Sequence, residues 1–171
     1  MMILVTGGSK NGKSHWAESY LDDWTQEKYY IACMEPYGQE AMAAVMRHQK
    51  MRAGKGFCTI EKHRKIEEIE PKKSWGILLE CISTLCANEM FQEDGSYCHP
   101  ADRIIEAVRM LKEKAGRLVV VTNEVGEDGG CYEEGTRAYI REIGQINQAL
   151  ADMADQVVEC VCGIPIIWKG R

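Results

Sequence analysis

Near its start the chain carries a glycine-rich segment with a lysine and a serine at the spacing of a phosphate-binding loop. An apolar run, residues 1–5, leads into Gly7-Gly8-Ser9-Lys10-Asn11-Gly12-Lys13-Ser14. Backbone N–H groups exposed by glycine can surround a polyphosphate, Lys13 at an exposed loop end can contact the outer phosphates, and the Ser14 hydroxyl can bind Mg²⁺. The segment therefore predicts nucleotide binding; the alternative is an ordinary glycine turn.

A second group with chemistry to offer is a carboxylate that ends an apolar run. Gly76-Ile77-Leu78-Leu79 leads into Glu80, which is the kind of position where a P-loop enzyme holds its metal ion. Asn123-Glu124 follows the later apolar run in an equivalent place and is a weaker candidate for the same role. Carboxyl ends of parallel strands meet at one edge of a sheet, so Glu80 and the P-loop are expected close together. The alternative is a solvent-facing strand end.

One of the four histidines stands among cations. His48 lies in Met46-Arg47-His48-Gln49-Lys50-Met51-Arg52, where Arg47, Lys50 and Arg52 can neutralise phosphate charge. A neutral imidazole nitrogen can attack phosphorus and form a covalent intermediate. These residues alone favour the alternative, an exposed helical histidine among ordinary surface cations.

The eight cysteines do not predict a metal site. No C-x-x-C pair and no zinc-finger spacing of Cys and His occurs. Cys81, Cys160 and Cys162 lie in or beside apolar runs and are interpreted as small core residues.

These groups need a scaffold, and the hydrophobic pattern predicts an α/β domain. Apolar runs at 1–6, 28–33, 76–81, 117–122 and 156–162 alternate with helical patterns, which is typical of a parallel sheet flanked by helices. A helix follows the P-loop, another is expected over 39–53, and a long amphipathic one over 133–154. A short β-like piece covers 57–62. No linker or repeat divides residues 1–171, which predicts a single domain.

Composition narrows the class of partner and the compartment. The net charge is −5 and the basic residues are scattered, which argues against nucleic acid or an anionic membrane as partner. The first apolar run is too short for a signal peptide and no run of 18 apolar residues occurs, so a cytoplasmic protein is expected.

Taken together, the motifs resemble those of the bifunctional adenosylcobinamide kinase/adenosylcobinamide-phosphate guanylyltransferase family. The resemblance runs nearly from end to end, and its most specific parts are His-x3-Arg and Asn-Glu-Val-Gly. The matching segments are the P-loop, Tyr30-Ile31-Ala32, His48 with Arg52, Thr59-Ile60-Glu61, Leu78-Leu79-Glu80-Cys81 through Asn88, 121–126, Asn147-Gln148, Ala154-Asp155 and Gly163-Ile164-Pro165.

The resemblance implies a RecA-like P-loop fold, a homotrimer and two reactions. ATP or GTP first phosphorylates the aminopropanol hydroxyl of adenosylcobinamide, with Mg²⁺ as cofactor. GTP then transfers GMP through a histidine-bound intermediate, which gives adenosylcobinamide-GDP.

Carried over residue by residue, the resemblance implies a full set of site residues. His48 is the guanylylated nucleophile, Lys13 is catalytic, and Ser14 and Glu80 are metal ligands, although a nucleotide contact for Glu80 stays open. The implied nucleotide contacts are Gly7, Gly8, Ser9, Lys10, Asn11, Gly12, Lys13, Ser14, Cys33, Met34, Glu35, Gln49, Lys50, Met51, Arg52, Glu61 and Glu80.

Three segments depart from the family pattern. Residues 127–132 replace the usual Gly-Ile-Val-Pro, Cys33 replaces a Thr, and Tyr37-Gly38-Gln39-Glu40 replaces an acidic segment. These departures bear on the corrinoid side of the pocket and on the kinase step. An enzyme with one of the two activities, and a GTP-binding regulatory protein without turnover, are the alternatives.

Overall fold

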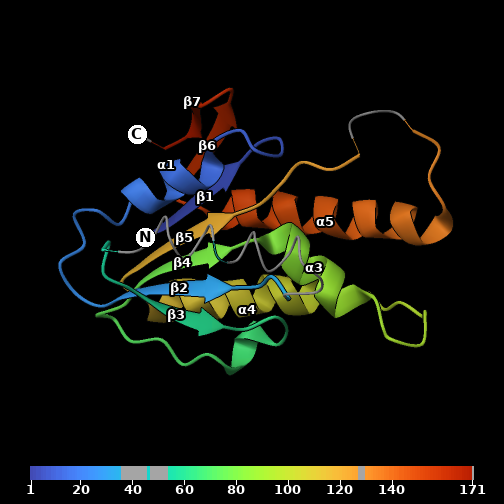
Figure 1. Cartoon of the computed structure of the whole chain (residues 1–171), viewed down its shortest axis with the longest axis horizontal. Helices are drawn as coiled ribbons and strands as arrows, with labels where there is room; N and C mark the ends of the chain where they lie inside the picture. Colours follow the sequence, from blue (N-terminus) through green and yellow to red (C-terminus); the bar gives the residue numbers. More distant parts are fainter. Residues whose placement is uncertain (36–45, 47–53, 127–129, 171) are drawn as a thin grey trace.

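A computed structural model of the chain describes residues 1–35, 46, 54–126 and 130–170, and these residues form a seven-stranded sheet with helices on both faces (Figure 1). The strand order is β3-β2-β4-β5-β1-β6-β7. All neighbouring strands run parallel except β6 and β7, which pair antiparallel. The expected α/β class, with a mostly parallel central sheet flanked by helices, is confirmed.

The elements follow one another in an alternating order that brings the strand ends to one edge. Their bounds are β1 (Met2–Thr6), α1 (Lys13–Ser19), β2 (Lys28–Ala32), β3 (Phe57–Glu61), the 3₁₀ helix η1 (Ile66–Glu68), β4 (Gly76–Glu80), α3 (Ile82–Met90), α4 (Ala101–Lys114), β5 (Arg117–Val121), α5 (Glu134–Met153), β6 (Gln156–Val161) and β7 (Ile164–Lys169).

The central strands are buried on both faces because the side chains of each strand alternate between two helical layers. On one face, Leu4, Leu79 and Val120 pack with α3, α4 and α5. On the other, Val5 and Val121 pack with α1. Figure 1 shows α1 on one side of the sheet and α4 behind the strands on the other. The near-continuous apolar runs in the sequence follow from this double burial.

The structure differs from the sequence-based expectations at the end of the chain. β7 was not predicted, and Pro165 is its second residue. An edge strand tolerates proline because one side of its backbone needs no ladder hydrogen bond. Cys162, interpreted as a core residue, is exposed in the β6–β7 turn at φ 50°, and Cys81 is only half-buried. Cys160 is buried as expected.

Two other expectations concern the segment between β2 and β4. The helix expected over 39–53 lies almost entirely outside the described residues. The β-like piece at 57–62 is confirmed as β3, and it is an edge strand of the sheet next to β2. In the described ranges no helix is long and apolar enough to cross a membrane.

A buried carboxylate joins the two long helices. Glu142 of α5 is 7% exposed, accepts a hydrogen bond from the backbone N–H of Ala101 at 2.9 Å and contacts His99 Nδ1 at 2.8 Å. Pro100 at the start of α4 has no capping side chain, so Glu142 supplies the acceptor that the first turn lacks. This contact fixes α4 against α5 and so fixes the layer under the sheet.

We expect Glu142→Ala to lower the free energy of unfolding by about 1–3 kcal/mol, because a buried N–H loses its partner. At this chain length each kcal/mol corresponds to roughly 2–4 °C in Tm, which calorimetry can measure. Glu134→Ala on the same helix is the control. Its ion pairs with Arg137 and Arg141 lie at the surface, where such pairs contribute little. Equal losses in the two variants would contradict the role of Glu142.

Candidate active site at the carboxyl edge of the sheet

The P-loop connects β1 to α1, where the sequence places it. Gly7 has φ 133°, and a Cβ at this position would lie 2.5 Å from the carbonyl oxygen of Cys160 on β6. Only glycine allows the P-loop and β6 to approach each other this closely. Gly12 has φ 88° at the start of α1, while Ser9 and Lys10 between them are exposed. The loop therefore packs closely against β6 at Gly7, and its residues Ser9, Lys10 and Gly12 are exposed.

The sequence predicts Lys13 at an exposed loop end, but the structure shows that Lys13 is buried. Its side chain is 7% exposed, and Nζ donates a hydrogen bond to the Gly8 carbonyl oxygen at 2.6 Å. Burial lowers the pKa of Lys13, an effect opposed by nearby thiol and carboxyl groups, including Glu124 and Glu80. The ammonium is thus held inside the loop and faces two carboxylates.

Glu80 meets the P-loop across one intervening strand. The Ser14 hydroxyl donates to Glu80 Oε1 at 2.8 Å, although β5 lies between β4 and β1. Burial raises the pKa of Glu80, and the negative charge of Glu18 adds to this, while Ser14 and Lys13 oppose it. This contact agrees with the prediction that Glu80 and the P-loop lie at the same edge of the sheet, while the metal and nucleotide roles of the two residues stay predictions.

The donor set at this contact suits a magnesium ion. A hydroxyl and a carboxylate oxygen are hard ligands, and Mg²⁺ in nucleotide sites is bound by one or two such groups together with phosphates and water. No cluster of three or more His, Cys, Asp or Glu that could hold a metal occurs within the described ranges. The arrangement fits an ion that takes its remaining ligands from a nucleotide.

The residues after β5 are fixed by two other elements. Thr122, which is fully buried, donates from Oγ1 to Asn147 Oδ1 at 2.7 Å, and Asn147 Nδ2 donates back to the Asn123 carbonyl oxygen at 3.2 Å. Asn123 Nδ2 donates to Ser83 Oγ at 2.7 Å. The turn that precedes Glu124 is therefore held by both α5 and α3.

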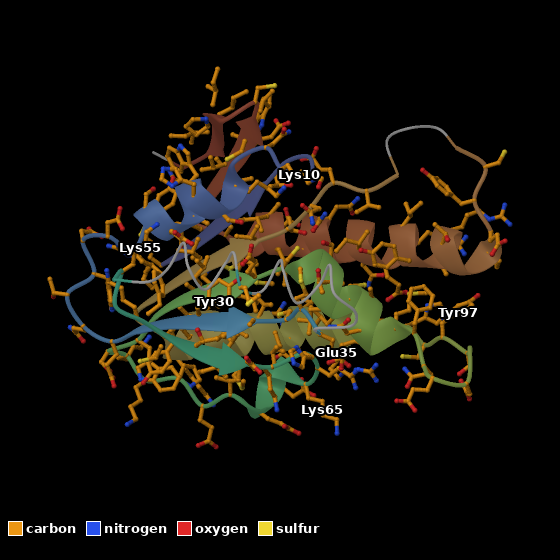
Figure 2. All side chains as sticks on the ribbon, viewed as in Figure 1. Lys10, Tyr30, Glu35, Lys55, Lys65 and Tyr97 are labelled. Carbon is orange, nitrogen blue, oxygen red and sulfur yellow. The ribbon has the colours of Figure 1, made fainter. Side chains whose placement is uncertain are left out.

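Beyond β2 and β3 the candidate contacts differ in exposure. Cys33 is fully buried, whereas Met34 and Glu35 are half-buried and Glu61 is exposed. Ala32 of β2 is in register with Glu61 on one side and Glu80 on the other, so the three strand ends are level. Figure 2 shows Lys10 and Glu35 at this edge, where the parallel strands end.

Asn88 was not singled out for a role, yet it holds two of these loops together. Its Nδ2 donates to the carbonyl oxygens of Cys33 at 2.7 Å and His63 at 3.0 Å. The Cys33 N–H in turn donates to the Glu80 carbonyl oxygen at 3.0 Å. An asparagine in a helix gives no periodic signal, so only its place in the resemblance could have drawn attention to it.

The remaining predicted residues, His48, Gln49, Lys50, Met51 and Arg52, lie outside the described residues. The chain is described again from Gly54, and the next residue, Lys55, forms an ion pair with Glu18 of α1. Glu18 is 3% exposed and lies four residues, one helical turn, after Ser14. Figure 2 shows Lys55 beside α1.

Comparison with known proteins gives a consistent family match. The family model described as cobinamide kinase / cobinamide phosphate guanyltransferase matches residues 3–167. The bifunctional adenosylcobalamin biosynthesis protein CobU of Escherichia coli K12 is 33% identical over 97% of this chain and 98% of its own length. CobU of Salmonella typhimurium is 34% identical with the same coverage. The relatives and this chain thus match over nearly their whole lengths.

A solved structure supports the fold alone. A protein of Pyrococcus horikoshii OT3 from a structural study superposes with a TM-score of 0.50 at 10% identity, over 99% of this chain and 86% of its own.

We expect Glu80→Gln to raise the Tm of the ligand-free protein at neutral pH. The raised pKa of Glu80 means that folding disfavours its charged form. A neutral amide can still accept the hydrogen bond from Ser14, and it removes the free-energy cost of burying the charge. Each kcal/mol gained in the free energy of unfolding would raise Tm by roughly 2–4 °C.

The raised pKa of Glu80 also predicts how this difference in Tm depends on pH. Protonation relieves the cost in the native protein, so the difference in Tm between the wild type and the Glu80→Gln variant shrinks as pH falls through the range where Glu80 takes up a proton. Calorimetry at several pH values tests this, with Glu113→Gln at an exposed site as control. A Tm lowered by Glu80→Gln at neutral pH would contradict it.

Proposed function

The chain belongs to the cobinamide kinase/cobinamide phosphate guanylyltransferase family, and we propose that the carboxyl edge of its sheet carries both reactions. The protein is a bifunctional cobinamide kinase and cobinamide-phosphate guanylyltransferase of adenosylcobalamin biosynthesis. The observation that supports the proposal most is the 2.8 Å hydrogen bond from Ser14 to Glu80.

In the first step, the P-loop binds the triphosphate of ATP or GTP. The backbone of residues 7–12 surrounds the phosphates, and Lys13 exchanges its bond to Gly8 for a phosphate oxygen. Ser14 and Glu80 hold Mg²⁺, which supplies charge neutralisation to the transferring phosphoryl group. Since Lys13 is already buried, its attraction to phosphate acts in a region of low dielectric and is strong.

In the second step, His48 attacks the α-phosphorus of GTP and pyrophosphate leaves. The GMP then passes from the histidine to the phosphorylated corrinoid. Lys50 and Arg52 neutralise phosphate charge, and Cys33, Met34, Glu35, Gln49, Met51 and Glu61 contribute to the nucleotide pocket. Glu61 is level with Glu80 across the intervening strand β2, and Glu35 follows the end of β2 by three residues, which supports their place in one pocket.

We also propose that the chain acts as one domain, in the cytoplasm, as a homotrimer. The continuity of the sheet from β3 to β7 supports one domain, the family resemblance of the motifs implies the trimer, and the short apolar runs of the sequence support the compartment. Neither nucleic acid nor membrane enters as a partner.

The trimer predicts a mass in solution of about three times 19.3 kDa, measurable by multi-angle light scattering. Protein is compared over a range of concentrations, because mass action shifts any assembly. A mass of one chain at all concentrations would contradict the proposal without affecting the assignment of the P-loop.

The covalent step predicts where label from GTP remains. After denaturation, label on the α-phosphate should stay with the protein and label on the γ-phosphate should not. The bond should break in acid and survive alkali, as a phosphoramidate does. His48→Asn should abolish α-labelling while the phosphorylation of cobinamide persists, and Lys13→Ala should reduce both, because it removes a phosphate partner common to the two steps.

His15→Asn is the matched control for this experiment. His15 is exposed on α1 next to Ser14, so it reports the effect of a lost imidazole near the loop without a lost nucleophile. α-Label retained in His48→Asn would show that another residue is the nucleophile.

A further inference from the structure

A second carboxylate lies at the P-loop besides Glu80. Glu124, three residues beyond the end of β5, accepts a hydrogen bond through Oε1 from the Thr6 hydroxyl at 3.1 Å. Thr6 ends β1 and directly precedes Gly7 of the P-loop. The charge of Glu124, like that of Glu80, acts on the Lys13 ammonium. Two carboxylates from neighbouring strands therefore face one buried cation.

The other carboxylates near this cation are already engaged. Glu80 accepts from Ser14, and Glu18 is buried and paired with Lys55. Glu124 differs because the partner that the structure gives it is an uncharged hydroxyl on one oxygen. Its second carboxylate oxygen has no partner among residues 1–35, 46, 54–126 and 130–170, and the side chain is half-buried rather than enclosed.

Glu124 is also held in a defined position. The residues before Glu124 are fixed through Asn147 of α5 and Ser83 at the start of α3. The Thr6 hydroxyl holds the carboxylate of Glu124. A group that must meet a substrate atom at hydrogen-bond distance needs this kind of support. Residues 127–132, the segment that departs from the family pattern, follow shortly after it in the chain.

We propose that Glu124 is the general base of the kinase step; this rests on the proposed function. The second carboxylate oxygen of Glu124 accepts the proton of the attacking substrate hydroxyl. The hydroxyl oxygen forms a bond to the γ-phosphorus, the bond from that phosphorus to the β–γ bridging oxygen breaks, and the nucleoside diphosphate leaves. The proton then passes from Glu124 to solvent. Glu80 and Glu124 thus divide the metal and proton roles.

Thr6 acts in this scheme as a positioning residue. Its hydroxyl holds one carboxylate oxygen of Glu124, so that the other oxygen points to the hydroxyl of the substrate. Thr6→Val removes the hydrogen bond at nearly constant volume, and Thr6→Ser retains it. Thr6→Val should lower kcat of phosphorylation with little change in KM, whereas Thr6→Ser should restore most of the rate.

The experiment measures the two half-reactions separately. Phosphorylation of adenosylcobinamide is followed with ATP or GTP, and GMP transfer is followed with adenosylcobinamide phosphate supplied. In Glu124→Ala and Glu124→Gln, kcat of phosphorylation should fall about 10²–10⁴-fold. The Kd for nucleotide, measured by calorimetry, should change less than threefold, and GMP transfer should fall less than tenfold.

Chemical rescue distinguishes a base from a structural residue. Added formate should restore part of the phosphorylation rate in Glu124→Ala, in proportion to its concentration, and should leave the wild-type rate unchanged. Glu159→Gln is the control, because Glu159 of β6 is in register with Thr6 but bonds Trp168 of β7 instead of the P-loop. Its rates should match those of the wild type.

Three results would overturn the inference. These are an unchanged kcat in Glu124→Ala, a loss of both half-reactions together with nucleotide binding, and a loss of phosphorylation that formate does not restore. A wild-type protein that phosphorylates no corrinoid while it binds nucleotide would instead overturn the proposed function, and this is measured before the variants.

Discussion

The hydrogen bond between Ser14 and Glu80 is the contact on which the site depends. It joins the first turn of α1 to the end of β4 although β5 separates their strands, so it exists only when three parallel strands end level with one another. The register of the sheet is set by apolar residues buried between two helical layers. The core therefore determines the distance between the Ser14 hydroxyl and the Glu80 carboxylate at the carboxyl edge of the sheet.

The sequence predicted the central sheet well and its outer edge poorly. Strands β1, β2, β4, β5 and β6 are apolar runs because both faces are covered, and that pattern cannot be mistaken for an alternating one. β7 lies at an edge with Ile164, Ile167 and Trp168 exposed, so it has neither a continuous buried run nor a buried face. Its pairing with β6 depends on a turn at Cys162 and Gly163, which both have positive φ.

The site was predictable wherever a motif fixes the backbone. Gly7, Lys13 and Ser14 lie where the pattern puts them, and Glu80 meets Ser14 because parallel strands share an edge. The burial of Lys13 was not predictable, since it depends on a carbonyl oxygen that points inward at Gly8. The two hydrogen bonds of Asn88 were missed for a similar reason. Their acceptors are backbone carbonyl oxygens, which every residue type has, so the sequence gives no sign of them.

The Gly8 carbonyl accepts the hydrogen bond from Lys13 that a phosphate oxygen accepts in the proposed function. Under the proposed function, nucleotide binding exchanges the hydrogen bond from Lys13 Nζ to the Gly8 carbonyl for one to a phosphate oxygen, instead of adding a bond. The net gain in affinity from Lys13 is the difference between the two bonds. The same exchange runs in reverse when the nucleotide leaves. The Gly8 carbonyl then accepts the hydrogen bond from Lys13 again, so the buried ammonium keeps a partner. In the proposed reaction, this exchange lets the loop bind a polyphosphate and still release the product.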